Sequence, residues 1–187
     1  HLLALVNDVL DMSKLEAGQA SFEAVDFDIS QLMQDVSYLV KAQILDMELT
    51  HRAHRENIQH TLLLGYPLQL RQILLNLFSN AIKYNKKGGF IDTTAKEISF
   101  DGETVIYEFS ITDTGIGMSE SFVKNQLFEP FTQEKSDART QYKGTGLGMS
   151  IVKKLIQQMN GTIQVESKLG EGTTFTFRLP FKLAKGE

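Results

Sequence analysis

The sequence predicts an α/β sandwich in which a mixed, mostly antiparallel sheet carries three main helices on one face. Stretches with helical spacing of apolar residues alternate along the chain with short stretches of strand character. A chain of 187 residues is also long enough to bury one full core without a metal or disulfide staple. It contains no cysteine, which excludes a disulfide scaffold, a cysteine-ligated zinc site and a thiol nucleophile.

Residues 1–18 read as a helix from the first position. Leu2, Leu5, Val9 and Met12 form one apolar seam, and a second seam runs beside it. One helix cannot bury so wide a stripe alone, so we expect partner helices upstream or in another chain. The predicted division is therefore a helical piece at 1–18 and a catalytic unit at 19–187.

The next elements are a strand, a helix and a strand pair. A short strand is expected over 22–27, and Asp28 or Ser30 can cap a helix that ends near Leu45. The inward residues of this helix are expected to be Leu32, Met33, Val36, Leu39, Val40 and Ile44. Strands at 48–55 and 61–65 follow, with a polar turn between them.

Pro67 suits the first turn of a helix that runs to about Tyr84. A turn at 86–89 leads into a hairpin, 91–100 with 104–112, around Asp101-Gly102. Helical spacing returns briefly near Ser119.

Residues 129–145 are polar and lack clear periodicity. A helix is expected over 146–159, and Asn160-Gly161 suits its end. Two strands, 162–167 and 173–180, surround a glycine turn at 170–172, and the tail after Phe181 is expected to fray.

Charge and hydropathy exclude several classes of protein. Lys plus Arg number 19 and Asp plus Glu 23, so the net charge of −4 argues against general nucleic-acid binding. The apolar runs are too short to span a membrane, and the first residues lack the pattern of a signal peptide.

The helix near 68–84 carries the first informative motif. Asn76, Asn80 and Lys83 share a stripe beside the apolar face, at i, i+4 and i+7. An amide oxygen is a hard ligand for Mg²⁺, and a lysine donates to phosphate oxygens. A solvated polar face is the simpler alternative for this stripe taken alone.

Two glycine motifs follow. Asp113-Thr-Gly-Ile-Gly117 comes directly after a strand, where glycines permit close backbone approach to a ligand and the carboxylate can accept from an exocyclic amine. Gly144-Thr-Gly-Leu-Gly148 opens a helix, where backbone N–H groups can bind an anion, although its spacing is not that of a Walker loop. The alternatives are a turn and a glycine-rich hinge.

Two smaller motifs are ambiguous alone. Gly170-Glu-Gly-Thr173 reads most simply as a hairpin turn, and Phe128-Glu-Pro-Phe131 as a hydrophobic anchor at the start of a loop.

The order of these motifs decides between the alternatives. An Asn-x-x-x-Asn helix, Asp-x-Gly-x-Gly, Phe-x-x-Phe, Gly-x-Gly-x-Gly and a last glycine turn resemble the motif series of the Bergerat ATP-binding fold. Over roughly 22–181 the chain resembles the catalytic domain of sensor histidine kinases, and 1–18 resembles the second helix of the dimerisation and phosphotransfer hairpin of hybrid-type kinases. The motifs are then the N box (76–84), the first glycine box (113–117), the F box (128–131) and the second glycine box (144–148).

The resemblance implies ATP and Mg²⁺ as cofactors and assigns roles to residues. Asp113 would accept from the adenine amino group, Thr173 would line the adenine end, and residues 129–145 would form a mobile lid over the nucleotide. The residues implied in catalysis are Asn76, Asn80, Lys83 and Arg139, of which Asn76 and Asn80 would also handle the metal. Those implied in nucleotide binding are Asn80, Tyr84, Asp113, Gly115, Gly117, Lys143, Gly144, Thr145, Gly146, Leu147, Gly148 and Thr173.

One departure from the family concerns the phosphoacceptor. No His-Glu pattern occurs in the sequence, and His1 is followed by Leu2-Leu3, so we assign it no catalytic role. His51, His54 and His60 fall in the predicted strand pair, and we interpret them as surface residues.

The resemblance therefore implies a protein-histidine kinase whose acceptor lies outside this sequence. Its partners would be the phosphoacceptor hairpin and the receiver domain of a response regulator. The whole protein would be a homodimer anchored to the membrane elsewhere, with this part in the cytoplasm. The alternatives are a conformational ATPase of the gyrase type, which carries a Glu base where Asn76 sits, or an interaction module with a degenerate pocket.

Overall fold

The computed structural model describes residues 6–7, 9–10, 23–130, 132 and 148–186. The strands are β1 (Val25–Asp28), β2 (Thr50–Glu56), β3 (Leu62–Gly65), β4 (Phe90–Phe100), β5 (Thr104–Asp113), β6 (Thr162–Lys168) and β7 (Gly172–Leu183). The helices are α2 (Ile29–Asp46), α3 (Pro67–Lys83), α4 (Glu120–Asn125) and α6 (Gly148–Gln158).

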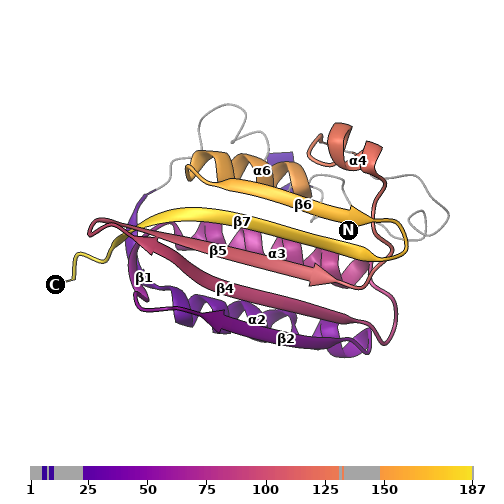
Figure 1. The fold of residues 1–187 in the computed structure, drawn as a ribbon, viewed down its shortest axis with the longest axis horizontal. Coiled ribbons are helices and arrows are strands. Elements are labelled where there is room, and N and C mark those ends of the chain that lie inside the picture. Colours follow the sequence, from indigo (N-terminus) through magenta and orange to yellow (C-terminus); the bar gives the residue numbers. More distant parts are fainter. Residues whose placement is uncertain (1–5, 8, 11–22, 131, 133–147, 187) are drawn as a thin grey trace.

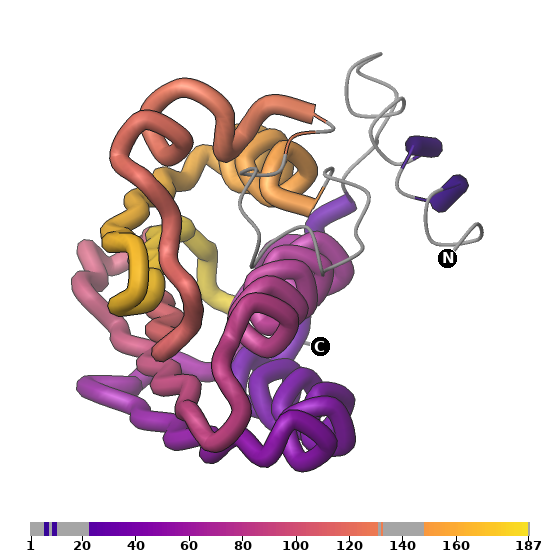
Figure 2. The backbone as a smooth tube through the Cα atoms, turned by 90° about the vertical axis from the view of Figure 1, so that its right-hand side faces the viewer, coloured from indigo at the N-terminus to yellow at the C-terminus, as the bar shows by residue number. Residues whose placement is uncertain are grey.

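The predicted sandwich is confirmed. Helices α2, α3 and α6 cover one face of the sheet, and none of the helices that the structure describes covers the other face (Figure 1). The strand order is β1-β3-β7-β5-β4-β2, with β6 also paired to β7. Every pairing is antiparallel except the parallel pair of β2 and β4. Figure 2 shows the layer of strands and the layer of helices edge-on.

The predicted start and buried face of α2 are confirmed, apart from one residue. Asp28 is the N-cap, and its Oδ1 accepts from the backbone N–H groups of Ser30 and Gln31 at 2.9 and 3.2 Å. The buried residues of α2 are Ile29, Leu32, Val36, Val40 and Ile44. Leu39 was expected to point inward and is 45% exposed, because the buried stripe passes through Val36 and Val40 instead.

Helix α3 begins at Pro67, as predicted, and lies under the middle of the sheet (Figure 1). Its buried residues are Leu70, Ile73, Leu74, Leu77, Phe78, Ala81 and Ile82. Helix α6 packs beside it and buries Ile151, Val152, Leu155 and Ile156. The N box therefore lies on the central helix, whose apolar face is held by the core.

The predicted pairing of β2 with β3 is wrong. Strand β2 lies at one edge beside β4, whereas β3 lies between β1 and β7. The connection between them is fastened to the sheet by Glu97, which accepts from the N–H groups of Gln59 and His60 at 3.0 and 2.8 Å. The hydroxyl of Tyr107 donates to the carbonyl of His60, and burial raises the pKa of Tyr107 to about 12.

All three histidines of this region were expected to lie on the surface, but only one of them is fully exposed. His54 is exposed, but His51 and His60 are half-buried. The Nε2 of His51 lies 2.9 Å from Thr93 Oγ1, and burial lowers the pKa of His51 despite the nearby charge of Asp92.

The contact between His60 and Glu97 is more buried than the contact between His51 and Thr93. The Nδ1 of His60 lies 2.9 Å from Oε2 of Glu97, whose side chain is only 6% exposed. Burial raises the pKa of Glu97, but hydrogen bonds from the His60 ring and from two backbone N–H groups outweigh it, so the pKa lies below its usual value. His51 and His60 therefore act as structural contacts of the sheet.

The chain end is held further than predicted. Strand β7 continues to Leu183, and the N–H of Ala184 donates to the carbonyl of Leu62 at 3.1 Å. The carboxylate of Asp26 then accepts from the N–H groups of Lys185 and Gly186 at 3.0 and 3.1 Å. The expectation of a frayed tail after Phe181 is wrong for these residues.

The predicted first helix is described only at Val6, Asn7, Val9 and Leu10, which are helical and exposed. The rest of 1–18 lies outside the described residues, so the division at residue 18 stays a prediction. Among the helices that the structure describes, none is long and apolar enough to cross a membrane.

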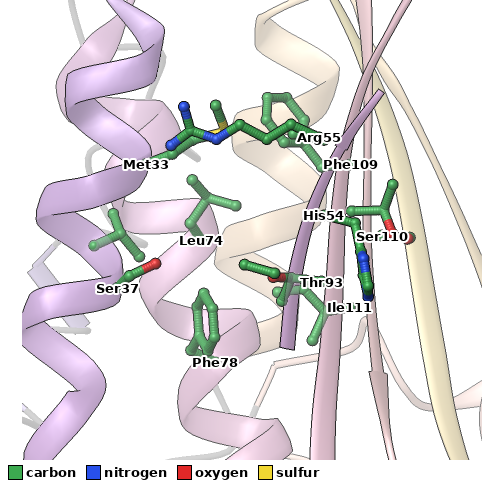
Figure 3. A pocket seen from close by; sticks show the side chains of 14 residues that line it. Met33, Ser37, His54, Arg55, Leu74, Phe78, Thr93, Phe109, Ser110 and Ile111 are labelled. Carbon is green, nitrogen blue, oxygen red and sulfur yellow. The ribbon is translucent and has the colours of Figure 1, made fainter. Parts of the chain in front are cut away.

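A cavity of about 60 Å³ lies between α2, α3 and the strands β2, β4 and β5 (Figure 3). Leu74 and Phe78 of α3 face it from one side (Figure 3), and Ala95 of β4 also lines it. Arg55 lies across one end of it, and its Nη1 donates to Ser30 Oγ at 2.6 Å. It is several times larger than one water molecule needs and far smaller than the pockets that bind nucleotides.

We expect Ala95→Val to stabilise the fold, because two added methyl groups would fill part of this cavity. Filling a cavity commonly raises the free energy of unfolding by about 0.5–2 kcal/mol, which urea denaturation measures. Ala81→Val is the control, since Ala81 is equally buried but does not line the cavity and should be overpacked. Equal destabilisation by both variants would show that the cavity cannot accept a larger side chain.

Candidate functional site

The described parts of the predicted motifs meet at one end of the sheet, where α3 and β5 end and β4 and β7 begin (right side of Figure 1). Asp113, the last residue of β5, pairs with Thr173 of β7. The N–H of Ile116 donates to the carbonyl of Tyr84, the C-cap of α3, at 3.0 Å. The N box, the first glycine box and the last glycine turn are therefore neighbours, as the order of the motifs predicts.

The N-box stripe lies beside the buried face of α3. Asn76, Asn80 and Lys83 are each half-buried, so their polar groups lie at the border between core and solvent. The amide nitrogen of Asn76 donates to the carbonyl of Gly148 at 3.3 Å, which connects the N box to the first residue of α6. The Nζ of Lys83 lies 5.6 Å from the centre of the Tyr84 ring.

Asp113 forms the floor of the site. It is only 8% exposed, and its Oδ1 accepts from the N–H of Gly115 at 2.8 Å. A carboxylate has about four acceptor positions, so it can accept from more than one donor at once. A nearly buried carboxylate at the end of a strand can therefore accept a hydrogen bond from a donor group of a bound ligand.

Three glycines allow backbone segments to touch around this floor. A Cβ on Gly115 would overlap the carbonyl oxygen of Tyr84, and a Cβ on Gly117 would overlap that of Lys168. A Cβ on Gly172 would overlap the carbonyl oxygen of Asp113. Gly117 and Gly172 also have positive φ angles, of 67° and 104°, which other residues rarely adopt. Glycine is therefore required here for space as well as for conformation.

Ser167 belongs to this group and was missed from the sequence. Its Oγ lies 2.7 Å from Oγ1 of Thr173 and accepts from the N–H of Met118 at 2.8 Å. It also lies 3.1 Å from the carbonyl oxygen of Gly172. The only available signal was its place opposite Thr173 in the hairpin around Gly170.

Asn85 and Thr114 were missed as well. Asn85 follows the N box and is only 2% exposed, and its amide group forms three hydrogen bonds, one from Nδ2 and two to Oδ1. One of its partners is the hydroxyl of Thr114 in the first glycine box, at 2.8 Å. A side-chain contact therefore joins the two boxes in addition to the contact between Tyr84 and Ile116.

The second glycine box and the predicted lid are only partly described. Arg139, Lys143, Gly144, Thr145, Gly146 and Leu147 lie outside the described residues, as do Phe131 and most of 129–145. In the F box, Phe128 is half-buried against the core, and the Nζ of Lys153 lies 5.2 Å from its ring centre. The assignments of these residues stay predictions.

Asn76 and Asn80, the predicted metal ligands, carry amide oxygens rather than charged groups. Among the described residues, no group of three His, Cys, Asp or Glu side chains could hold an ion. Because the nitrogen of Asn76 faces the carbonyl of Gly148, its oxygen points elsewhere as an acceptor. That donor set suits a cation whose other ligands are phosphate oxygens and water.

Comparisons with known proteins agree with this geometry. Residues 65–183 match the family model described as "Histidine kinase-, DNA gyrase B-, and HSP90-like ATPase". The circadian input-output histidine kinase CikA of Synechococcus elongatus is 39% identical over 96% of this chain, which spans 23% of CikA. The histidine-protein kinase BarA of Escherichia coli is 35% identical over 98% of this chain, which spans 20% of BarA. The chain thus spans about a fifth to a quarter of these relatives.

Solved structures show the same arrangement. Full-length ShkA in complex with AMPPNP matches all of this chain with a TM-score of 0.81 and 34% identity, over 37% of ShkA. The catalytic domain of the histidine kinase ThkA matches 85% of this chain with a TM-score of 0.67 and 26% identity, over 96% of that domain. The chain therefore belongs to the family of histidine kinase-, DNA gyrase B- and HSP90-like ATPases, and its relatives in that family are sensor histidine kinases.

Proposed function

We propose that residues 19–187 are the ATP-binding catalytic domain of a sensor histidine kinase. The observation that carries the proposal is the meeting of Asp113, Thr173 and the end of the N box around three glycines that leave no room for a Cβ. Such a surface presents backbone groups and one buried carboxylate, which suits a flat base with a phosphate tail. The AMPPNP complex of the similar protein ShkA supports ATP as the ligand.

Each residue has a role in this proposal. Asp113 accepts from the exocyclic amine of adenine, and so favours ATP over GTP, whose base presents a carbonyl there. Lys83 and the lid residues Arg139 and Lys143 supply positive charge to the phosphates, and Tyr84 lies toward the sugar. The backbone of Gly144, Thr145, Gly146, Leu147 and Gly148 supplies N–H donors at the start of α6. Asn76 and Asn80 supply amide oxygens to Mg²⁺, which neutralises charge on the phosphates when bound.

The reaction is transfer of the γ-phosphoryl group to a histidine of a hairpin helix, and then to an aspartate of a response regulator. Phosphoryl transfer depends mainly on positioning and charge neutralisation, which Asn, Lys and Arg side chains provide. Asn76 also separates this proposal from the gyrase-type alternative. An amide cannot act as the general base for hydrolysis, and that of Asn76 contacts Gly148.

The remaining parts of the proposal concern the whole protein. Residues 1–18 form the end of the second hairpin helix, and the hairpin makes the homodimer. The histidine acceptor, the receiver partner and the membrane anchor lie in other segments or proteins, with this domain in the cytoplasm. ThkA has been solved in complex with the response regulator TrrA, which is consistent with a receiver as partner.

We expect Asp113→Asn and Asn80→Ala to lose most of their Mg-ATP affinity. An unpaired buried donor costs about 1–3 kcal/mol, or roughly ten- to a hundredfold in affinity, which calorimetry measures. Asp101→Asn is the matched control, because Asp101 caps the turn at the far end of the same hairpin. If both site variants bound Mg-ATP like the parent protein, the site assignment would be wrong.

A second pair of variants tests the close approach of the backbone. Gly172→Ala should abolish ATP binding or folding, because its Cβ would overlap Asp113. Gly170 also has a positive φ, of 81°, but a Cβ at this position would meet nothing within 4 Å. Gly170→Ala should therefore cost only about 1–2 kcal/mol of stability and leave the affinity for ATP unchanged. Circular dichroism and calorimetry separate the two effects, and equal behaviour of the two variants would contradict the proposed packing.

The transfer reaction is tested with γ-labelled ATP. The chain alone should take up no acid-labile label, because it contains no His-Glu acceptor pattern. Addition of a hairpin domain from the same protein should give labelled hairpin. If the chain alone took up acid-labile label, and the label mapped to any of its histidines, this part of the proposal would be wrong.

A further inference from the structure

A buried hydrogen-bonded cluster joins the two motifs that are proposed to hold opposite ends of the nucleotide. Asn85 lies directly after Tyr84, and its Nδ2 donates to the carbonyl of Phe90 at 3.1 Å. Its Oδ1 accepts from the N–H of Lys86 at 2.9 Å and from the hydroxyl of Thr114 at 2.8 Å. One amide therefore contacts the turn after α3, the start of β4 and the first glycine box.

Thr114 completes the cluster with its hydroxyl. The Oγ1 donates to Asn85 and accepts from the N–H of Phe90 at 2.9 Å, so it acts as donor and acceptor at once. A methyl group in its place could do neither. The cluster is also tightly enclosed, because a Cβ on Gly89 would overlap the hydroxyl of Thr114 and lie 2.6 Å from Oδ1 of Asn85.

The position of Thr114 gives the cluster its connection to the site. It lies between Asp113, the proposed adenine acceptor, and Gly115, whose backbone approaches Tyr84. With its hydroxyl held by Asn85 and Phe90, the backbone on both sides of Thr114 has little freedom to rotate. The direction of the Asp113 carboxylate and its distance from the end of α3 are therefore set together.

From this geometry we infer that Asn85 and Thr114 are positioning residues for the nucleotide. Neither touches the ligand: they hold Asp113, at the adenine end, at a set distance from Lys83 and Tyr84, at the phosphate and sugar end. The inference rests on the proposed function. It requires that a ligand spanning both ends depends on the cluster more than a ligand that reaches only Asp113.

The test compares ATP, which spans both ends, with adenine, which reaches only the end of the site at Asp113. Thr114→Val removes the hydroxyl and nearly keeps the shape of the side chain, so ATP should bind about three- to tenfold more weakly. The affinity for adenine, titrated by NMR, should change less than twofold, and Thr114→Ser should restore ATP binding. A merely structural loss would weaken both ligands by the same factor.

Two further variants sharpen the test. Thr112→Val is the matched control, since Thr112 lies two residues before Thr114, near the end of β5, and its hydroxyl bonds Thr174 Oγ1 at 2.9 Å, away from the cluster. It should bind ATP like the parent protein. In an Asn85→Ala background, Thr114→Val should weaken ATP binding by a smaller factor than in the parent protein, because one of the two partners of the Thr114 hydroxyl is already gone and only the N–H of Phe90 remains.

The outcomes separate this inference from the proposed function. If Asp113→Asn loses ATP but Thr114→Val binds it like the parent protein, the positioning role is wrong and the nucleotide site stands. Equal weakening of ATP and adenine binding in Thr114→Val would also overturn the positioning role. A parent protein that binds no ATP overturns both.

Discussion

The architecture of the site depends on direct packing of backbone against backbone at one end of the sheet. Gly115, Gly117 and Gly172 each lie where a Cβ would overlap a carbonyl oxygen of another segment. Because no side chains intervene, main-chain atoms alone set the distances between the end of α3, the end of β5 and the start of β7. The positions of main-chain atoms vary less than side-chain rotamers do. The buried carboxylate of Asp113 is presented at this junction.

Polar side chains fasten the junction from two directions. Asn85 and Thr114 join it to the end of α3 and the start of β4, while Ser167 and Thr173 join it to the hairpin of β6 and β7. Buried polar groups are tolerated when they are hydrogen-bonded, and within the described part of the chain no buried side-chain donor or acceptor lacks a partner. The ligand-facing surface is thus supported by a second layer of satisfied hydrogen bonds.

The sequence was most informative where the relevant contacts are local. Asp28 caps α2 through N–H groups two and three residues away, and Pro67 begins α3. The order of the boxes predicted that the N box and the first glycine box lie together, since each box has its own recognisable spacing, and the contact between Tyr84 and Ile116 agrees with this. Ser167 and Asn85 could not be found in this way, because each is an ordinary residue at the end of an element. Their importance arises from the register of β6 on β7 and from the meeting of two turns.

By itself, the sequence determined which segments form helices and strands, which faces they bury and which motifs they carry, because caps, turn residues and apolar spacing act over a few residues. The tertiary structure alone decided how the strands are ordered. Strands β2 and β3 are separated because β4, β5 and β7 pair along most of their length and occupy the middle of the sheet. This leaves an edge for β2 beside β4 and a place for β3 beside β7. The tertiary structure also decided the surroundings of His51 and His60, since their partners Thr93 and Glu97 come from a strand some forty residues away in the sequence. Contacts of that range follow from the shared core, which no local pattern encodes.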